Sequence, residues 1–173
     1  HVCGKFAVVH NGIIENYMRL KAELADMGHV FSSDTDSETA AHLLEAYYRG
    51  DLLEAVQKTV RELEGSFALC LLCADYPDRV VCVRQKSPLI VGAGADGMLA
   101  ASDIPALGAC KKIRVLSDGE IALLSPEGAE FFDFSLSSLP AAFTDNAVRS
   151  VAVEKGRYAH FMRKEIGEEG RAV

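Results

Sequence analysis

The segment Phe6-Ala7-Val8-Val9-His10-Asn11-Gly12 sets the order of the first structural elements. Its continuous apolar run is typical of a short buried strand from Phe6 to His10, and Asn-Gly is a dipeptide that often ends a strand in a turn. Apolar residues then recur at helical spacing from Glu15 to Gly28, and a glycine suits the C-terminal cap of a helix. We therefore expect strand, turn and helix in this order.

Two more helices are expected before the helical periodicity gives way to short apolar runs. Thr35 and Glu38 have the spacing of a capping box and would open a helix that ends near Gly50. A third apolar periodicity runs from Asp51 to Gly65. Short β-branched or apolar runs follow, and they predict strands at 66–74, 79–84, 89–91, 98–101, 113–116, 120–124 and 130–132. Helices followed by many short strands indicate the α+β class, with a sheet covered by helices.

The composition indicates one globular domain with its own core. The 173 residues are 49% hydrophobic and 25% charged, with a net charge of −7 and interspersed acidic and basic residues. Such a surface disfavours nucleic acid or an anionic membrane as the main partner. The five cysteines are an odd number with irregular spacing. Free thiols in a reducing cytosol are the simpler interpretation, so a cytoplasmic location is expected.

The two ends of the sequence suggest that it belongs to a longer gene product. It begins at His1 rather than Met and enters an apolar strand within a few residues. Residues 135–155 are rich in Ser, Pro and Ala and poor in pattern, which is typical of a linker. Residues 157–169 could form a short helix. These features are interpreted as a piece of a longer chain that has lost something upstream.

Asn11-Gly12 has two interpretations. Both residues tolerate positive φ, so the pair can form a two-residue hairpin turn. Only Ile13-Ile14 separate it from the helical pattern, which is short for a return strand. The second interpretation is an oxyanion hole, because a glycine N–H and an asparagine side-chain amide are neutral donors suited to a developing negative oxygen.

The acidic segment Asp34-Thr35-Asp36-Ser37-Glu38 invites three interpretations. A calcium loop would need a glycine at its sixth position, where Thr39 stands. Thr35 or Asp36 could simply cap the following helix. Asp36, in the first turn, could instead receive the ammonium group of an amino-acid substrate.

Two further motifs are weak. Gly92-Ala93-Gly94-Ala95-Asp96-Gly97 matches the dinucleotide fingerprint, but no long helix follows it, so we expect a turn between strands. Cys70 and Cys73 are three apart in an apolar run and would point to opposite faces of a strand. No second cysteine pair or spaced histidine cluster accompanies them, so we expect neither a metal nor another cofactor.

Four ordered segments carry a family resemblance. The segment 8–17, Val-Val-His-Asn-Gly-Ile-Ile-Glu-Asn-Tyr, resembles the signature of glutamine amidotransferases with an N-terminal nucleophile. More narrowly, the chain is similar to the glutamine–fructose-6-phosphate aminotransferases, which make glucosamine 6-phosphate. The segments 33–38, 87–103 and 155–166 agree with that family in order and spacing, so the likeness covers essentially the whole chain.

The resemblance implies a fold, a reaction and three site residues. The fold would be an αββα sandwich of two antiparallel sheets, incomplete at its N-terminus. In the family, the thiolate of an N-terminal cysteine attacks the glutamine side-chain amide with its own α-amine as base, and a glutamyl thioester forms. Carried over, Asn11 and Gly12 match the oxyanion hole, and Asp36 matches the residue that holds the α-amino group of glutamine.

The same resemblance sets limits on this chain. Residues 1–134 would be a partial glutaminase domain, and residues 135–173 a linker and exit segment toward sugar-isomerase domains. The family's nucleophilic cysteine would precede His1, so the chain alone is expected to be inactive. Glutamine is the implied substrate, fructose 6-phosphate would bind only to the isomerase domains, and the parent would be a homo-oligomer. Two alternatives stay open: a different ammonia acceptor, or a non-catalytic module of the same fold.

Overall fold

A computed structural model describes residues 1–95, 97–108 and 110–146. The described helices are α1 (Tyr17–Asp26), α2 (Asp36–Tyr47), α3 (Leu52–Glu62) and the 3-10 helix η1 (Pro105–Leu107). None of them combines the length and the apolar character that a membrane crossing would require. The expected helix at residues 157–169 lies outside the described residues.

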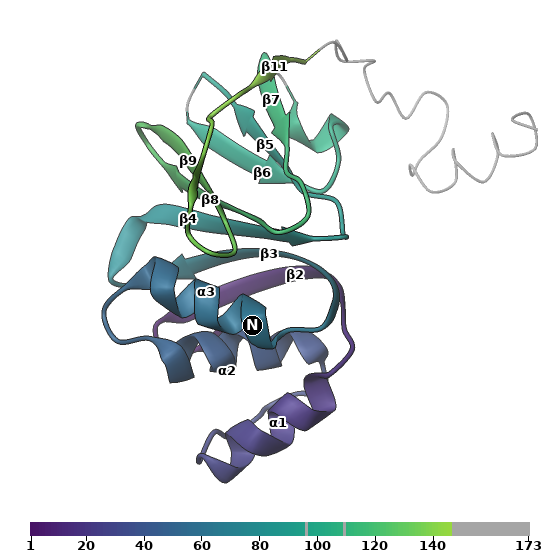
Figure 1. The fold of residues 1–173 in the computed structure, drawn as a ribbon, viewed down its shortest axis with the longest axis vertical. Coiled ribbons are helices and arrows are strands. Elements are labelled where there is room, and N and C mark those ends of the chain that lie inside the picture. Colours follow the sequence, from purple (N-terminus) through teal and green to yellow (C-terminus); the bar gives the residue numbers. More distant parts are fainter. Residues whose placement is uncertain (96, 109, 147–173) are drawn as a thin grey trace, which may run out of the picture.

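The described strands form two antiparallel sheets, as Figure 1 shows. The larger sheet contains, in spatial order, β1 (Val2–Cys3), β2 (Phe6–Ile14), β3 (Gly65–Cys73), β4 (Tyr76–Gln85), β8 (Glu120–Ser125), β9 (Gly128–Asp133) and β10 (Ser138–Leu139). The smaller sheet contains β11 (Thr144–Asp145), β7 (Lys112–Val115), β5 (Ile90–Ala93) and β6 (Met98–Ala101). The α-helices lie on the side of the larger sheet that faces away from the smaller one (Figure 1). The α+β class and the two-sheet sandwich are therefore confirmed.

Side-chain alternation along β3 explains why the larger sheet is covered on both faces. Phe67, Leu69 and Leu71 belong to the core beneath the helices, together with Leu44 of α2. Ala68 belongs to the second core, between the two sheets. Because successive side chains of a strand point to opposite faces, an apolar run such as β3 suits a strand that is buried on both sides. Cys73 joins the first core and Cys70 packs against the second, so these two thiols do point to opposite faces as expected.

The strand that was expected to end at Asn11-Gly12 continues through it. β2 runs to Ile14, with Asn11 opposite Ala68 and Gly12 opposite Phe67 in the ladder with β3. The prediction of a turn at this dipeptide was wrong. Gly12 has a φ of +128°, so its positive φ is used inside the sheet, where β2 and β3 approach closely.

The predicted capping box is also wrong, although the helix begins where it was expected. Thr35 is the N-cap residue of α2, but its side chain makes no capping hydrogen bond. The Glu38 carboxylate turns instead to Ser32 and Ser33, which offer both their backbone N–H groups and their hydroxyls. Four donors satisfy a buried carboxylate better than the single backbone N–H of a capping box.

The segment after residue 134 returns to both sheets. Ser138–Leu139 pairs with β9, and Thr144–Asp145 pairs with β7. These two short strands lie within the segment that the sequence suggested as a linker. The boundary near residue 134 stays a prediction, and the exit segment 155–166 lies outside the described residues.

Candidate active site

Asn11 lies at the rim of a hollow between the two sheets. The hollow has a volume of about 220 Å³, and its lining includes Ala68, Leu89, Ala100 and Ser102. Asn11 is exposed, and its side chain makes no hydrogen bond to any of the described residues. Its amide can therefore donate to a molecule that enters from solvent.

Gly12 has no room for a side chain beside β3. A Cβ atom built on Gly12 would lie 2.0 Å from the Ser66 carbonyl oxygen and 2.6 Å from the Ser87 hydroxyl. These two serines are themselves bonded, with 2.9 Å between their hydroxyl oxygens. The backbone around Gly12 is thus accessible from solvent on one side and fixed by β3 on the other. Only glycine satisfies both the positive φ and the lack of space.

Asp36 begins α2 and fastens this helix to the same end of β2. Its Oδ2 accepts a hydrogen bond of 2.8 Å from the backbone N–H of Ile14, two residues beyond Gly12. The Asp36 side chain keeps 22% of its surface exposed. A carboxylate can accept about four hydrogen bonds. Asp36 can thus hold the end of β2 and still pair with a cation, and the structure brings Asn11, Gly12 and Asp36 to one end of one strand.

His10 occupies the opposite face of β2 from Asn11. Its Nδ1 lies 2.9 Å from the Ser37 hydroxyl and 3.7 Å from Asp36 Oδ1. Burial lowers the pKa of His10, and the nearby Asp36 charge opposes this shift only in part. A neutral imidazole here links the start of α2 to β2. Nothing in the sequence beyond its position next to Asn11 marks His10 as part of this junction.

Glu38 orders the loop that precedes Asp36, a role that the sequence suggested only as a capping box. Its carboxylate receives the two serine N–H groups at 2.8 Å and the two hydroxyls at 2.7 and 2.6 Å. Burial acts to raise the pKa of Glu38, but the hydrogen bonds from Ser33 and Ser32 outweigh it and lower the pKa to about 2. The loop from Ser32 to Asp36 is thereby tied to the first turn of α2.

Replacing Glu38 by Gln is expected to lower the free energy of unfolding by about 2 kcal/mol. The hydrogen bonds from Ser32 and Ser33 would then reach a neutral amide instead of a charged carboxylate, and bonds to a charged acceptor are the stronger ones. The ionised Glu38 stabilises the folded chain above its ordinary pKa of 4.5, and this contribution is lost as the pH falls toward 2. Urea unfolding between pH 7 and pH 2.5 should thus show a smaller acid effect in Glu38→Gln. The exposed Glu130→Gln is the matched control, and an unchanged pH profile in the Glu38 variant would contradict the assignment.

The described cysteines are not arranged as nucleophiles for this site. Cys3 lies on β1, where its Sγ is 3.3 Å from His42 Nδ1. Cys70 lines the hollow beside Asn11, but its Sγ lies 3.5 Å from that of Cys82 on the neighbouring strand. Cys73 and Cys110 are buried in separate parts of the core. The thiol that does contact a base, Cys3 with His42, packs against the core beneath the helices, whereas Asn11 lines the hollow between the sheets.

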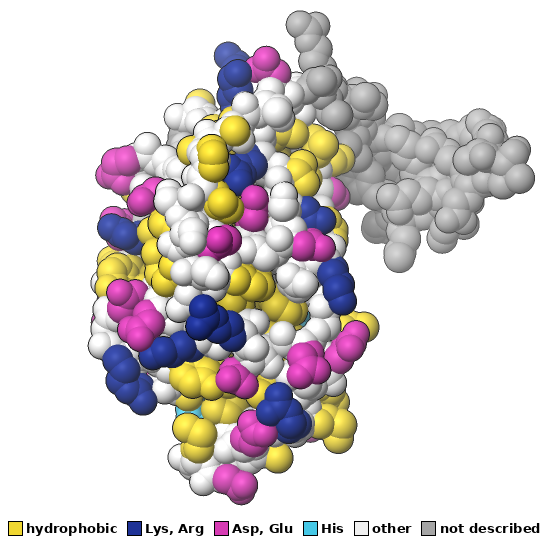
Figure 2. Space-filling view, in the orientation of Figure 1, with side chains coloured by type: hydrophobic (Ala, Val, Ile, Leu, Met, Phe, Trp, Pro, Cys, Tyr) yellow, Lys and Arg dark blue, Asp and Glu magenta, His cyan; other side chains and the backbone are white. Residues whose placement is uncertain are grey.

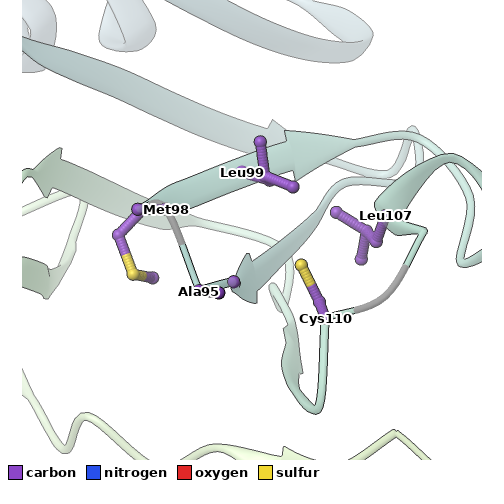
Figure 3. A pocket seen from close by; sticks show the side chains of 7 residues that line it. Ala95, Met98, Leu99, Leu107 and Cys110 are labelled. Atoms are coloured by element: carbon purple, nitrogen blue, oxygen red, sulfur yellow. The ribbon is translucent and has the colours of Figure 1, made fainter.

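The glycine-rich segment forms a turn beside a second hollow, shown in Figure 3. This hollow has a volume of about 280 Å³, and Ala95, Met98, Leu99, Leu107 and Cys110 are among the described residues that line it. The strand β6 follows the turn, whereas a dinucleotide fingerprint requires a helix there. Without a helix after the turn, the segment lacks the helix N-terminus that binds the pyrophosphate in a dinucleotide site.

Comparison with known proteins shows the family to which the chain belongs. Residues 1–109 match the family model described as a glutamine amidotransferase domain. The chain therefore belongs to the glutamine amidotransferase domain family.

Within this family, the chain is similar to enzymes of one name. The chain is 50% identical over 171 residues to the glutamine–fructose-6-phosphate aminotransferase (isomerizing) of Aquifex aeolicus, covering 98% of this chain and 29% of that protein. It is 45% identical over 170 residues to the enzyme of the same name from Bordetella pertussis, covering 98% of this chain and 28% of that protein. The chain thus spans less than a third of the length of these relatives.

Solved structures show the same fold. The glutamine phosphoribosylpyrophosphate amidotransferase of B. subtilis superposes with a TM-score of 0.67 at 25% identity, over 77% of this chain and 30% of that one. A glutamine aminotransferase class-II domain protein from Silicibacter pomeroyi gives a TM-score of 0.59 at 17% identity, over 75% of this chain and 68% of that one. The second likeness concerns the fold alone.

Proposed function

We propose that this chain supplies the glutamine-binding and ammonia-releasing part of an enzyme that converts fructose 6-phosphate and glutamine to glucosamine 6-phosphate and glutamate. The observation that carries the proposal is the shared position of Asn11, Gly12 and Asp36 at one end of β2, with the Asp36 carboxylate bonded to Ile14 N. The named relatives, all glutamine–fructose-6-phosphate aminotransferases, favour this acceptor.

The roles of the residues follow from their chemistry. A thiolate that attacks the side-chain amide of glutamine places negative charge on the amide oxygen. The Asn11 amide and the Gly12 N–H are the donors for this oxygen. The Asp36 carboxylate pairs with the α-ammonium group of glutamine in a charge-assisted hydrogen bond. We assign the nucleophile to none of the five cysteines of this chain, and the mechanism needs no metal or organic cofactor.

The test is glutamate release from glutamine by the complete gene product that contains this segment, with and without fructose 6-phosphate. Release that rises with the sugar phosphate, together with glucosamine 6-phosphate as product, is the expected result. A polypeptide of these 173 residues carries its free α-amine on His1, where it donates to the Val8 carbonyl oxygen. We therefore expect no glutamate release from that polypeptide alone. Steady glutamate release from it would show that these 173 residues do contain a nucleophile.

The alternative function is the transfer of ammonia to an acceptor other than fructose 6-phosphate. The B. subtilis structure with TM-score 0.67 is named as an amidotransferase acting with phosphoribosylpyrophosphate, so the same fold serves another ammonia acceptor there. Glutamate release that is unaffected by fructose 6-phosphate, but rises with a different phosphosugar, would favour this alternative. A folded product that binds glutamine without releasing glutamate would instead favour a non-catalytic module.

Asp36→Asn is expected to raise the KM for glutamine by about 10- to 100-fold, because a hydrogen bond between charged groups contributes roughly 1.5–3 kcal/mol. Asparagine keeps an oxygen for the Ile14 N–H, so the junction between α2 and β2 should survive. The matched control is Asp34→Asn, since the Asp34 side chain is fully exposed and its contact with Lys21 Nζ is long, at 3.5 Å. Steady-state kinetics of both variants decide the matter, and equal KM values would remove Asp36 from the substrate site.

A further inference from the structure

A cysteine and two histidines from three distant segments converge at the edge of the helical layer. Cys3 lies on β1, His29 in the loop after α1, and His42 in the middle of α2. His42 Nδ1 is 3.3 Å from Cys3 Sγ and 2.9 Å from His29 Nδ1. The three atoms all lie within 4.8 Å of one another. Figure 1 shows α1 beside α2, at the end of the molecule remote from the smaller sheet.

We propose that Cys3, His29 and His42 form a binding site for a zinc-class divalent ion. A tetrahedral zinc ion with bonds of about 2.0–2.3 Å to nitrogen and sulfur separates its ligand atoms by about 3.3–3.7 Å. The two contacts of His42 Nδ1 are a few tenths of an ångström shorter than this, and the third pair lies within 4.8 Å. Small side-chain rotations would bring the three atoms to the spacing of a bound ion. One thiolate and two imidazoles select zinc or cobalt over magnesium or calcium, which require oxygen ligands.

The surroundings of His42 match those of a metal-bound histidine. Its Nδ1 faces the other two ligands, while its Nε2 lies 3.7 Å from Glu38 Oε1. Histidines that bind metals often place their second ring nitrogen beside a carboxylate. At 3.7 Å the Glu38 contact is within ion-pair distance but is longer than a hydrogen bond. The Phe31 ring adds an apolar wall, with its centroid 4.2 Å from that of His42.

The cluster is open enough to load an ion. His42 is buried, with 5% of its surface exposed, whereas Cys3 and His29 are partly exposed. Three protein ligands leave a fourth position for water.

A bound ion would connect β1, the loop after α1 and α2 near the proposed active site. α2 carries Asp36 at its start and His42 six residues later. Occupancy would thus reinforce the position of the helix that presents Asp36. This effect is structural, and the proposed reaction at Asn11 and Gly12 has no step on the metal.

The test uses Co²⁺ as a spectroscopic substitute for Zn²⁺. The 173-residue chain, reduced and freed of metal with a chelator, is titrated with Co²⁺. We expect one ion per chain, visible bands of tetrahedral cobalt and a thiolate charge-transfer band in the near ultraviolet. Zn²⁺ should displace the cobalt and raise the melting midpoint, whereas Mg²⁺ should do neither.

Two variants make the result specific. Loss of a residue that hydrogen-bonds to a metal ligand typically weakens metal binding by roughly 10- to 100-fold. Loss of a ligand itself, in Cys3→Ser or His29→Ala, should therefore weaken it by at least about 100-fold. Both residues are partly exposed, so the variants should fold, which circular dichroism without metal verifies. Cys110→Ala, in a separate core cluster, is the control and should bind like the parent chain. An absent tetrahedral spectrum in cobalt excess, or unweakened binding by Cys3→Ser, would overturn the proposal.

Discussion

Asn11→Ala is expected to reduce the turnover number for glutamine hydrolysis in the complete gene product by about 10²–10³-fold, the usual effect of removing one oxyanion donor. The Asn11 side chain is exposed and forms no hydrogen bond within the described part of the chain, so its truncation leaves the fold intact. The lost interaction forms only when negative charge develops on the amide oxygen. The turnover number should therefore fall while the KM for glutamine changes little.

Asn11→Asp separates the donor function of this residue from its shape. Aspartate has nearly the same size as asparagine, but it places a negative charge where the oxyanion forms. We expect its turnover number to be at least as low as that of Asn11→Ala. Melting curves of both variants should match the parent protein, because the site lies at a solvent-exposed rim. Turnover within threefold of the parent in Asn11→Ala would show that the oxyanion is held elsewhere.

The interspersed charges of the sequence can be followed on the molecular surface. Figure 2 shows acidic and basic side chains mixed over the visible face, and the net charge of the whole sequence is −7. A nucleic-acid interface would need a continuous basic surface. Charges that are interspersed in the sequence thus stay interspersed on this face, and the exclusion of nucleic acid as a partner stays a prediction.

Local periodicity was sufficient for most of the secondary structure. The helical spacing in residues 52–62 and the apolar runs that became β3 and β8 each report the face that is buried against a neighbour. The resemblance of the segment 8–17 then supplied the arrangement of the sheets. Local rules failed at Asn11-Gly12, where the long ladder with β3 keeps in the sheet a dipeptide that would form a turn in isolation. A nine-residue pairing of this kind depends on a partner more than 50 positions away, so no local pattern reports it.

In the candidate site, too, some residues carry a local sequence signal and others depend on long-range contacts. Asn11, Gly12 and Asp36 were named from motifs in order along the chain, and their roles stay a prediction. The structure shows that they lie near one end of β2. The contacts of Glu38 with Ser32 and Ser33 depend on how the loop folds back, so the sequence suggested only a capping box. The cluster of Cys3, His29 and His42 has no regular spacing and forms only because β1 and α1 pack against α2. The separation of Glu38 and His42 by four residues on one helix was the only local signal for it.

Gly12→Ala is expected to unfold the chain or to lower its free energy of unfolding by about 4 kcal/mol or more, which is a large part of the 5–15 kcal/mol typical of a domain. The new methyl group would lie 2.0 Å from the Ser66 carbonyl oxygen, and a backbone atom in the middle of the larger sheet cannot rotate away. The strands β2 and β3 would have to separate along a ladder of nine paired residues. Any activity of the complete gene product should be lost with the fold, because Asn11 and the Ile14 contact of Asp36 lie on the displaced strand.

Gly28→Ala is the control that separates the clash from the backbone strain. Gly28 has a φ of +96°, comparable in sign to that of Gly12, but a Cβ atom there would meet nothing within 4 Å. Only the cost of a left-handed backbone remains, roughly 1–2 kcal/mol. Urea unfolding of both variants measures the difference directly. If the two substitutions cost the same, the conformation of Gly12 and not the approach of β3 requires glycine at this position. A far larger cost at Gly12 would show that the lack of space beside β3 is what requires glycine at this position.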